Sequence, residues 1–279
     1  MCCNSQYTNR QNATKCGCIL ENLIRDMKEK YNNSEAYHVM AQFYDRLMGD
    51  NKYIGWKKLI TEIVEKHKIP KGLGLDVACG TGNISKILID LGFKIRGVDF
   101  SAEMISIAQQ KFPAEKFICA DSRKFDFGKE QGTIDFAVSF YDSLNYLLDD
   151  NHILKTFKSV NACLKPGAIF LFDMNPMGHI EVAQKFKPRV FEDDDFYAVF
   201  RFGGEDRFWT LNIDFFIKEN DGHYRLITEK HIERGYNEDD VIHLLNQAAF
   251  KLLEVKKEYK IYEDNIEHLS RLYFVAEKL

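Results

Sequence analysis

The feature that most constrains the fold is a regular alternation of short apolar segments with amphipathic segments between residues 70 and 174. The predicted strands cover 72–79, 93–100, 116–120, 133–140 and 167–174, and the predicted helices between them cover 83–91, 101–112 and 151–164. Gly92, Ser101 and Asp149 are placed to end or cap these helices. Strands that are apolar along their whole length are typical of a parallel sheet covered on both faces.

The pattern changes after residue 176. Residues 196–202, 207–217 and 224–236 alternate apolar and polar positions with period 2 and have no helix between them, which predicts antiparallel strands. Asn237 and Asp240 form an approximate capping box for a helix over 238–250. Two further strands are predicted at the end of the chain, over 251–263 and 267–279.

These segments divide the chain into four parts. We expect a polar, Cys-containing N-terminal tail over residues 1–33 and a helical cap over 34–69, in which Ser34 caps the first of two helices. The core comprises 70–176 and 237–279, and residues 177–236 form an inserted antiparallel lid. The predicted fold class is α/β, a Rossmann-like, doubly wound, mostly parallel sheet of seven strands with helices on both faces.

Composition limits the partners. The net charge is -4 and the sequence pI is about 6.1, which argues against nucleic acid because phosphate binding needs a basic surface. No apolar run is long enough to cross a bilayer, and the first 20 residues lack the apolar segment of a signal peptide. We therefore expect a cytoplasmic protein without a membrane partner. The oligomeric state stays open, with a homodimer as one alternative.

Seven cysteines are present. Cys79, Cys119 and Cys163 lie in apolar segments and are expected to behave as small hydrophobic residues. The other four lie in the first 18 residues as a C-C and a C-x-C pair, which differs from the C-x-x-C spacing of zinc or redox sites. They are Cys2, Cys3, Cys16 and Cys18. Incidental thiols on a disordered tail are favoured over a metal or redox site, and no metal is predicted.

A glycine pair, Gly80 and Gly82, directly follows the first core strand, where open α/β sheets bind ligands. A dinucleotide fingerprint would have a third glycine where Ser85 stands, and a P-loop would have a lysine before the helix, whereas Lys86 lies within it. Asp99 ends the next strand, 19 residues after Gly80. A carboxylate there can accept hydrogen bonds from both hydroxyls of a ribose.

Five segments, in this order and spacing, resemble the class I S-adenosylmethionine-dependent methyltransferases: LDVACGTGN, GVDFSAEMISIA, ADSRKFDF, DFAVSFYDSLNYL and LKPGAIFLFDMN. The resemblance extends from about Tyr37 to the C-terminus. Three further segments resemble more specifically the small bacterial enzymes of the sugar-amine and small-metabolite type. They are YHVMAQFYDRLM, DSLNYL and EKHIERGY. The resemblance implies S-adenosyl-L-methionine as cofactor and S-adenosyl-L-homocysteine as product.

The resemblance also implies the cofactor contacts. Gly80 and Gly82 would form the floor under the methionine part, Asp76 would fix the loop, and Asp99 would hold the ribose. The residues expected to contact the adenine are Phe100, Met104, Asp121 and Ser122. Those expected around the methionine part or closing over the cofactor are Phe140, Tyr141, Tyr37 and Tyr44. Ordinary core packing is the open alternative for Phe100 and Met104.

The acceptor contacts are expected from the lid. Glu229 and His231 are two apart on a predicted strand and share a face, where they could bind or deprotonate an acceptor. An exposed polar strand face is the alternative, and Arg234 would need a bulge to join the pair. Tyr141 is the third candidate catalytic residue. The resemblance adds Asp142, Asn145 and Tyr146 as acceptor contacts, with a structural role favoured for Asn145, whereas His152 and His179 are expected at the surface.

The predicted function is methyl transfer from S-adenosylmethionine to a nitrogen or oxygen of a small-molecule acceptor, by in-line displacement. Methyltransferases that act on amino groups of nucleic acids resemble one another in an N/D-P-P-Y stretch after the fourth strand, where this chain has SFYDSLNY. The Pro-Cys pair that a cytosine C5 methyltransferase would have there is also absent. A peptide or protein amine as acceptor, and a non-catalytic cofactor-binding module, are the alternatives.

Overall fold

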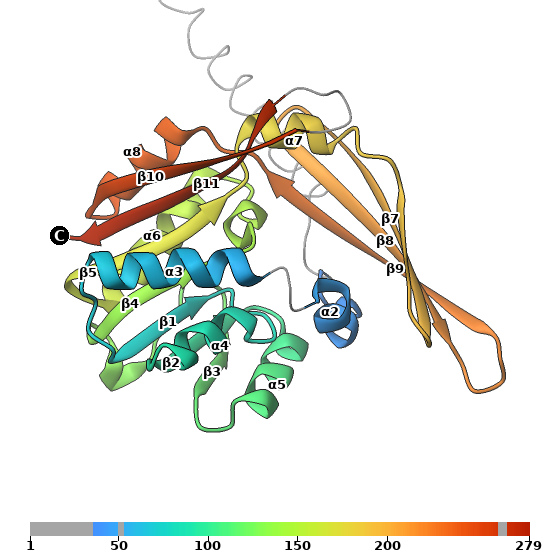
Figure 1. Cartoon of the computed structure of the whole chain (residues 1–279), viewed down its shortest axis with the longest axis horizontal. Coiled ribbons are helices and arrows are strands. Elements are labelled where there is room, and N and C mark those ends of the chain that lie inside the picture. Colours follow the sequence, from blue (N-terminus) through green and yellow to red (C-terminus); the bar gives the residue numbers. More distant parts are fainter. Residues whose placement is uncertain (1–35, 50–52, 262–266) are drawn as a thin grey trace, which may run out of the picture. The chain divides into compact units, whose positions relative to one another are not determined.

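The computed structural model describes residues 36–49, 53–261 and 267–279. The predictions for the Cys-containing tail and for Ser34 as a helix cap lie outside the described residues. Seven strands form one sheet in the order β10-β11-β5-β4-β1-β2-β3 (Figure 1). Their bounds are β1 Leu73–Val77, β2 Lys94–Asp99, β3 Lys116–Cys119, β4 Ile134–Ser139, β5 Leu164–Met174, β10 Phe250–Ile261 and β11 Glu267–Lys278.

The sheet is mostly parallel. Strands β1 to β5 pair in parallel, and β11 runs antiparallel to both β5 and β10. The strand order reverses at β1, which lies between β2 and β4. This reversal is the switch point at which open α/β sheets bind ligands beyond their carboxyl ends. The predicted doubly wound sheet of seven strands is therefore confirmed.

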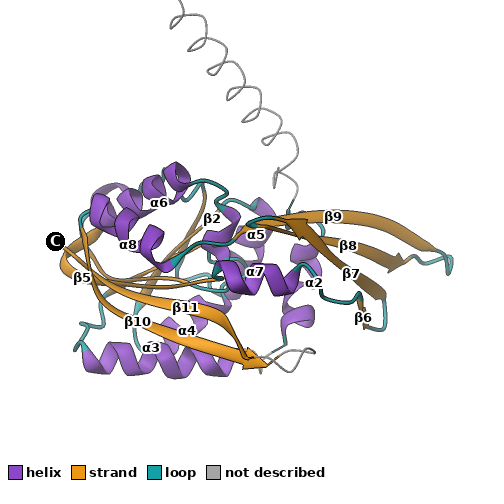
Figure 2. Cartoon of the chain, turned by 90° about the horizontal axis from the view of Figure 1, so that it is seen from above, coloured by secondary structure: helices purple, strands orange, loops and turns teal. Residues whose placement is uncertain are grey.

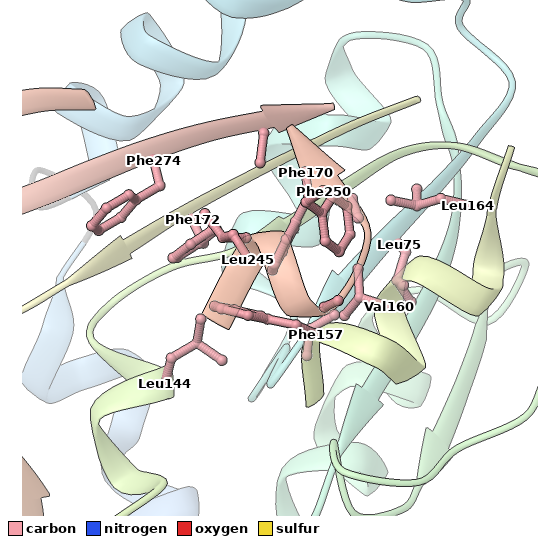
Figure 3. Close-up of a cluster of buried hydrophobic side chains, with 14 of the residues drawn as sticks. Leu75, Leu144, Phe157, Val160, Leu164, Phe170, Phe172, Leu245, Phe250 and Phe274 are labelled. Carbon is pink, nitrogen blue, oxygen red and sulfur yellow. The ribbon is translucent and has the colours of Figure 1, made fainter. Parts of the chain in front are cut away.

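Helices cover both faces of this sheet (Figure 2). Helices α6 (Asp150–Cys163) and α8 (Glu238–Gln247) pack on one face, where their apolar side chains surround phenylalanines of β5, β10 and β11 (Figure 3). Helices α3 (Ile54–Lys66), α4 (Asn83–Asp90) and α5 (Ala102–Lys111) contribute to the core of the other face. The predicted caps are present, since Ser101 accepts the Met104 amide hydrogen and Asp149 accepts that of His152.

The lid is a separate antiparallel sheet of four strands in chain order, β6 (Arg189–Glu192), β7 (Phe196–Glu205), β8 (Phe208–Lys218) and β9 (Tyr224–Arg234). Helix α2 (Met40–Met48) packs on one face of it, where the Phe43 ring lies 4.2 Å from the Phe196 ring and 5.5 Å from the Phe215 ring. The cap and the lid thus share a small core of their own.

Three details differ from the sequence prediction. The lid region also contains β6 and a seven-residue helix, α7 (Met177–Ala183), which is too short to produce a helical pattern. The first cap helix begins at Met40 instead of residue 35, because Tyr37 has a positive φ of 66°. Asn237 is the N-cap of α8, but its side chain bonds Asp240 at 3.2 Å instead of a backbone amide. Two short 3-10 helices, η2 (Gly128–Glu130) and η3 (Ser143–Tyr146), complete the core.

No helix in the described ranges is long and apolar enough to span a membrane. No group of three or more His, Cys, Asp or Glu side chains within those same ranges is placed to hold a metal ion.

Replacing Gly97 by alanine is expected to destabilise the protein by about 1–3 kcal/mol, the usual effect of overpacking a core. A Cβ on Gly97, in β2, would collide with the Phe117 ring and lie 2.9 Å from the Cys79 sulfur. Urea unfolding measures the loss. Gly178→Ala, in α7, is the matched control, because its Cβ would meet nothing within 4 Å. Equal stability of the two variants would contradict this packing.

Asp76, in β1, is a buried carboxyl group that accepts a hydrogen bond from the Ser85 hydroxyl at 2.6 Å. Burial raises its pKa from 3.8 to about 7. Between these two values the folded protein holds a proton that the unfolded chain has released, so this group lowers stability as the pH rises. Once the pH exceeds the folded-state pKa, the contribution becomes constant.

The variant Asp76→Asn is therefore expected to gain stability relative to the wild type as the pH rises from about 4 to about 7. The slope of the difference should be about 1.4 kcal/mol per pH unit. Urea unfolding at a series of pH values measures it, with the exposed Asp194→Asn as control. Parallel curves for Asp76→Asn and wild type would show that Asp76 ionises alike in both states.

Candidate active site

The loop after β1 lies at the carboxyl end of the sheet and has an unusual backbone. Ala78, Gly80 and Gly82 have positive φ values of 57°, 53° and 85°. A Cβ on Gly82 would lie 2.9 Å from the Phe112 ring, whereas one on Gly80 would meet only the Met104 sulfur, at 3.9 Å. Gly82 is therefore required both because a side chain would collide with Phe112 and because its φ is positive. At Gly80 the space beside the backbone is open. Cys79 is buried and fills space beside the loop.

Asp99 connects this loop to β2. Its Oδ2 accepts the Gly80 amide hydrogen at 2.9 Å, and its Oδ1 accepts that of Ser101, also at 2.9 Å. Burial raises the pKa of Asp99. Asp99 thus lies beside the loop, whereas Asp76, in β1, bonds Ser85 in the first turn of α4.

The residues predicted to contact an adenine lie beyond β2 and β3. Met104 is buried, but Phe100 is 45% exposed, so core packing accounts for Met104 and leaves Phe100 unexplained. Asp121 forms an ion pair with Arg123, and the hydrogen bonds that the Arg123 side chain donates lower the pKa of Asp121. The Ser122 hydroxyl lies 3.2 Å from that of Thr156.

Helix α2 is attached to the glycine loop through Asp45. Asp45 Oδ1 accepts hydrogen bonds from the Thr81 hydroxyl at 2.6 Å and from Asn83 at 2.8 Å. Its Oδ2 pairs with Lys111 at 2.9 Å. The sequence prediction missed Asp45, because nothing in the pattern of the cap helix separates this acid from a solvent-exposed one.

A group of aromatic rings lies beyond this loop. The Tyr37 ring lies 6.0 Å from that of Tyr44 and 5.6 Å from that of Tyr146, and the Trp56 ring lies 4.9 Å from that of Tyr141. Burial raises the pKa of Tyr37, Tyr44 and Tyr146 well above 10, so these phenols stay neutral at physiological pH. The sequence prediction included the tyrosines but missed Trp56.

The turn between β4 and η3 has two successive residues in the left-handed region, Tyr141 with φ 66° and Asp142 with φ 53°. Both backbone amides donate to the buried carboxylate of Asp173, at 3.2 and 2.8 Å. Trp56 Nε1 and Arg271 Nη1 donate to the same carboxylate at 3.2 and 2.6 Å. Asp173 therefore holds the turn in its unusual conformation. Phe140, just before the turn, is buried in the core.

Three carboxyl groups, those of Asp142, Asp173 and Glu233, lie near the guanidinium of Arg271. Arg271 Nη2 lies 3.0 Å from Asp142 Oδ1, and Arg271 also pairs with Asp173. Glu233, in β9, accepts a hydrogen bond from Asn175 at 3.0 Å. Burial, and then the charge of Asp142, raise the pKa of Glu233 well above its usual value. We name Asp142, Asp173, Glu233 and Arg271 the carboxyl cluster.

Sequence reasoning missed three members of the carboxyl cluster, Asp173, Glu233 and Arg271, which come from strands far apart in the chain. The one available signal was Asp173, an acid inside an apolar strand. Asn145 has the structural role expected for it, since its amide bonds the backbone of Asn175 and Arg234.

Glu229 and His231 share a face of β9, as predicted, with His231 Nε2 3.4 Å from Glu229 Oε2. They are 4% and 1% exposed, so the alternative of an exposed polar strand face is wrong. Glu229 Oε1 accepts the amide hydrogens of Val39 and Met40 at the start of α2. Arg234 does not join them and pairs instead with Asp150 at 2.7 Å.

The two histidines expected at the surface are both partly buried. Burial lowers the pKa of His179 to about 4, so this side chain is neutral at physiological pH. His152 Nε2 lies 2.8 Å from Arg123.

Comparison with known proteins fits this arrangement. A family described as a methyltransferase domain matches residues 75–167. The chain is 34% identical over 251 residues to a Bacillus subtilis (strain 168) protein named "Putative methyltransferase YqeM", covering 87% of this chain and 97% of the relative.

Two solved structures are similar as well. A S-adenosylmethionine-dependent methyltransferase from Clostridium acetobutylicum ATCC 824 has a TM-score of 0.72 and 26% identity, over 87% of this chain and 98% of that chain. The sugar N-methyltransferase KedS8 from Streptoalloteichus sp ATCC 53650 has a TM-score of 0.65 and 19% identity, over 80% and 86% of the two chains, and shows the fold alone. With its glycine loop and the relative that it matches over almost the whole length, the chain belongs to the S-adenosylmethionine-dependent methyltransferases.

Proposed function

We propose that this methyltransferase acts on the nitrogen of a small-molecule amine, which narrows the nitrogen or oxygen acceptor expected from the sequence. The observation that carries the proposal is the carboxyl cluster, which lies among tyrosines at the carboxyl ends of β4 and β5. A cationic amine is the ligand that such surroundings attract.

The residues around the glycine loop fit the cofactor. Gly80 leaves space for a ligand against its backbone, and the Asp99 carboxylate lies beside that space. We assign Gly80, Gly82 and Asp76 to the methionine side and Asp99 to the ribose. The adenine would be held by Phe100, Met104, Asp121 and Ser122, and the remaining contacts by Tyr37, Tyr44, Phe140 and Tyr141. Bound S-adenosylmethionine supplies an electrophilic methyl group, and the protein aligns the acceptor and excludes water.

Charge favours an amine over a neutral acceptor. The cluster holds three carboxyl groups, Asp142, Asp173 and Glu233, against the single guanidinium of Arg271, and burial raises the pKa of Asp173 and of Glu233. With one of the three carboxyl groups protonated, the excess is one negative charge in a buried site, where an added cation is stabilised. Asn175 Oδ1, next to Glu233, is buried and has no hydrogen-bond partner among the described residues. It can accept a hydrogen bond from an ammonium group.

The structural neighbour KedS8 is named a sugar N-methyltransferase, and its fold is compatible with the nitrogen acceptor proposed here. For catalysis we assign Tyr141 to positioning the acceptor beside the cofactor, and buried His231 with Glu229 to receiving, at the end of the transfer, the proton that the acceptor loses. An ammonium group must lose a proton before its lone pair can attack, so a base near the acceptor accelerates the reaction.

Calorimetry tests the cofactor assignment. The wild type should bind S-adenosylmethionine, and Asp99→Ala should bind at least about 10-fold more weakly, because it loses a charge-assisted hydrogen bond of about 1.5–3 kcal/mol. Asp126→Ala, at an exposed position, is the control. Because Asp99 also anchors Gly80, Asp99→Asn separates loss of the charge from loss of the loop. Absence of binding to the wild type would refute the assignment.

A labelled-methyl assay tests the acceptor. Cell extract is incubated with the protein and S-adenosylmethionine that carries a deuterated methyl group, and mass spectrometry identifies what gains the label. We expect label on the nitrogen of a small amine. Label on a hydroxyl or on a protein would refute the proposed acceptor, and no label in any product would favour a non-catalytic module.

Asp142→Asn is expected to lower kcat/KM for the amine by about 10- to 100-fold, mainly through KM, because the cation loses a charged hydrogen-bond partner. Asp126→Asn should match the wild type. Steady-state kinetics at pH 7 measure both variants. An unchanged KM in a folded Asp142→Asn protein would show that Asp142 does not bind the acceptor.

A further inference from the structure

A continuous line of polar contacts joins the cap, the core and the lid beside the carboxyl cluster. The Tyr37 hydroxyl donates to the Tyr146 hydroxyl at 2.9 Å, and Tyr146 Oη lies 3.0 Å from His231 Nδ1. His231 Nε2 faces Glu229 Oε2 at 3.4 Å. We name Tyr37, Tyr146, His231 and Glu229 the hydroxyl-imidazole chain. Its members come from the turn before α2, from η3 and from β9.

The direction of the hydrogen bonds follows from the donors. Because Tyr146 Oη accepts the hydrogen of Tyr37, its own hydrogen is free to point to His231 Nδ1. In the tautomer that receives this hydrogen, Nδ1 is the acceptor of the ring, the ring hydrogen lies on Nε2, toward Glu229, and the imidazole is oriented to take a proton from Tyr146.

At the other end of the hydroxyl-imidazole chain, His231 and Glu229 are arranged to stabilise a positive charge. His231 Nε2 and Glu229 Oε2 are both buried and have no hydrogen-bond partner within the described ranges. At 3.4 Å they are slightly beyond hydrogen-bond length, but within reach of an ion pair if the ring becomes an imidazolium. The amides of Val39 and Met40 hold the other oxygen of Glu229 in place.

We propose that Tyr146 accepts the proton that the acceptor ammonium must lose and passes its own hydroxyl proton to His231, with Glu229 balancing the new imidazolium. This rests on the proposed function. The ammonium N–H bond breaks and a Tyr146 O–H bond forms, while the original Tyr146 O–H bond breaks and an N–H bond forms at His231 Nδ1. The amine keeps its electron pair, and Tyr146 ends neutral.

Burial explains why the proton must move on from Tyr146. His231 is 1% exposed and cannot reach a substrate itself, whereas Tyr146 is only partly buried. Burial raises the pKa of Tyr146, so its phenolate is not available as the base. Tyr146 is thus the catalytic residue of the chain, and His231 and Glu229 act through it. The other ionisable groups near Tyr146 are Tyr37, Tyr44, Asp142 and Glu233.

The test is the pH dependence of methylation of a panel of small amines, comprising glucosamine, tyramine and spermidine, by the full-length protein. At pH 7, Tyr146→Phe and His231→Gln should lower kcat by about 10²- to 10⁴-fold, with little change in KM. The loss should shrink as the pH approaches the pKa of the free amine, because the amine then arrives without its extra proton. Glu229→Gln should show a smaller loss of the same kind.

Tyr197→Phe is the matched control. Tyr197, on β7, bonds Glu192 at 3.1 Å, away from the chain, and its variant should follow the wild-type profile. A loss in Tyr146→Phe that is equal at every pH, or no loss, would overturn the relay. If the wild type methylates none of these amines, the proposed function fails for this panel, and the measurement that follows still decides the relay.

That measurement needs no acceptor. The nitrogen chemical shifts of ¹⁵N-histidine-labelled protein, with S-adenosylhomocysteine added, report which ring nitrogen carries hydrogen. The His231 signal is assigned by its absence in His231→Gln. We expect hydrogen on Nε2 and an unprotonated, hydrogen-bonded Nδ1 that shifts in Tyr146→Phe. Hydrogen on Nδ1 would overturn the relay.

Discussion

The acceptor side of the site depends on the carboxylate of Asp173. Its burial is costly, since the effective penalty for removing a carboxylate from water is several kcal/mol. Four donors offset that penalty, and they come from α3, from the turn after β4 and from β11. The same bonds hold Tyr141 and Asp142 at positive φ, a conformation that persists only where surrounding contacts enforce it. The orientation of Asp142 toward Arg271 and Glu233 follows from this one group.

Two acids attach helix α2 to different parts of the protein. Asp45 connects it to the glycine loop and to Lys111, and Glu229 holds the amides at its start. The apolar contacts of Phe43 with the lid add to both. The cofactor loop and the lid are therefore linked through a helix that belongs to neither. Tyr37, just before this helix, takes its place beside Tyr146 as a result.

The part of the site that was predictable from the sequence is the part built from local signals. Strand β1, the two glycines and Asp99 are adjacent or separated by one helix, so periodicity and turn chemistry were enough to place them. The carboxyl cluster joins residues 142, 173, 233 and 271, and no pattern within a single segment relates them. The start of α2 was misplaced for a similar reason, because a partner 189 residues away, Glu229, binds its first amides. The short helix α7 and strand β6 gave no periodic signal of their own.

This division has a consequence for specificity. The donor side rests on backbone geometry at Gly80 and Gly82, which few substitutions can alter without loss of the loop. The acceptor side rests on side chains from the lid, the cap, β5 and the last strand, and not on the backbone of one loop. A fold can therefore keep one cofactor while its acceptors diverge, as expected where function resides in sites carried by a common scaffold. In this chain the acceptor side combines a cluster of carboxyl groups with an imidazole behind a phenol. A single carboxylate would be poor at both binding an ammonium and accepting its proton, because a group that binds an ammonium tightly also stabilises its protonated form. In the proposed site the carboxyl cluster binds the ammonium, and the phenol and the imidazole take its proton.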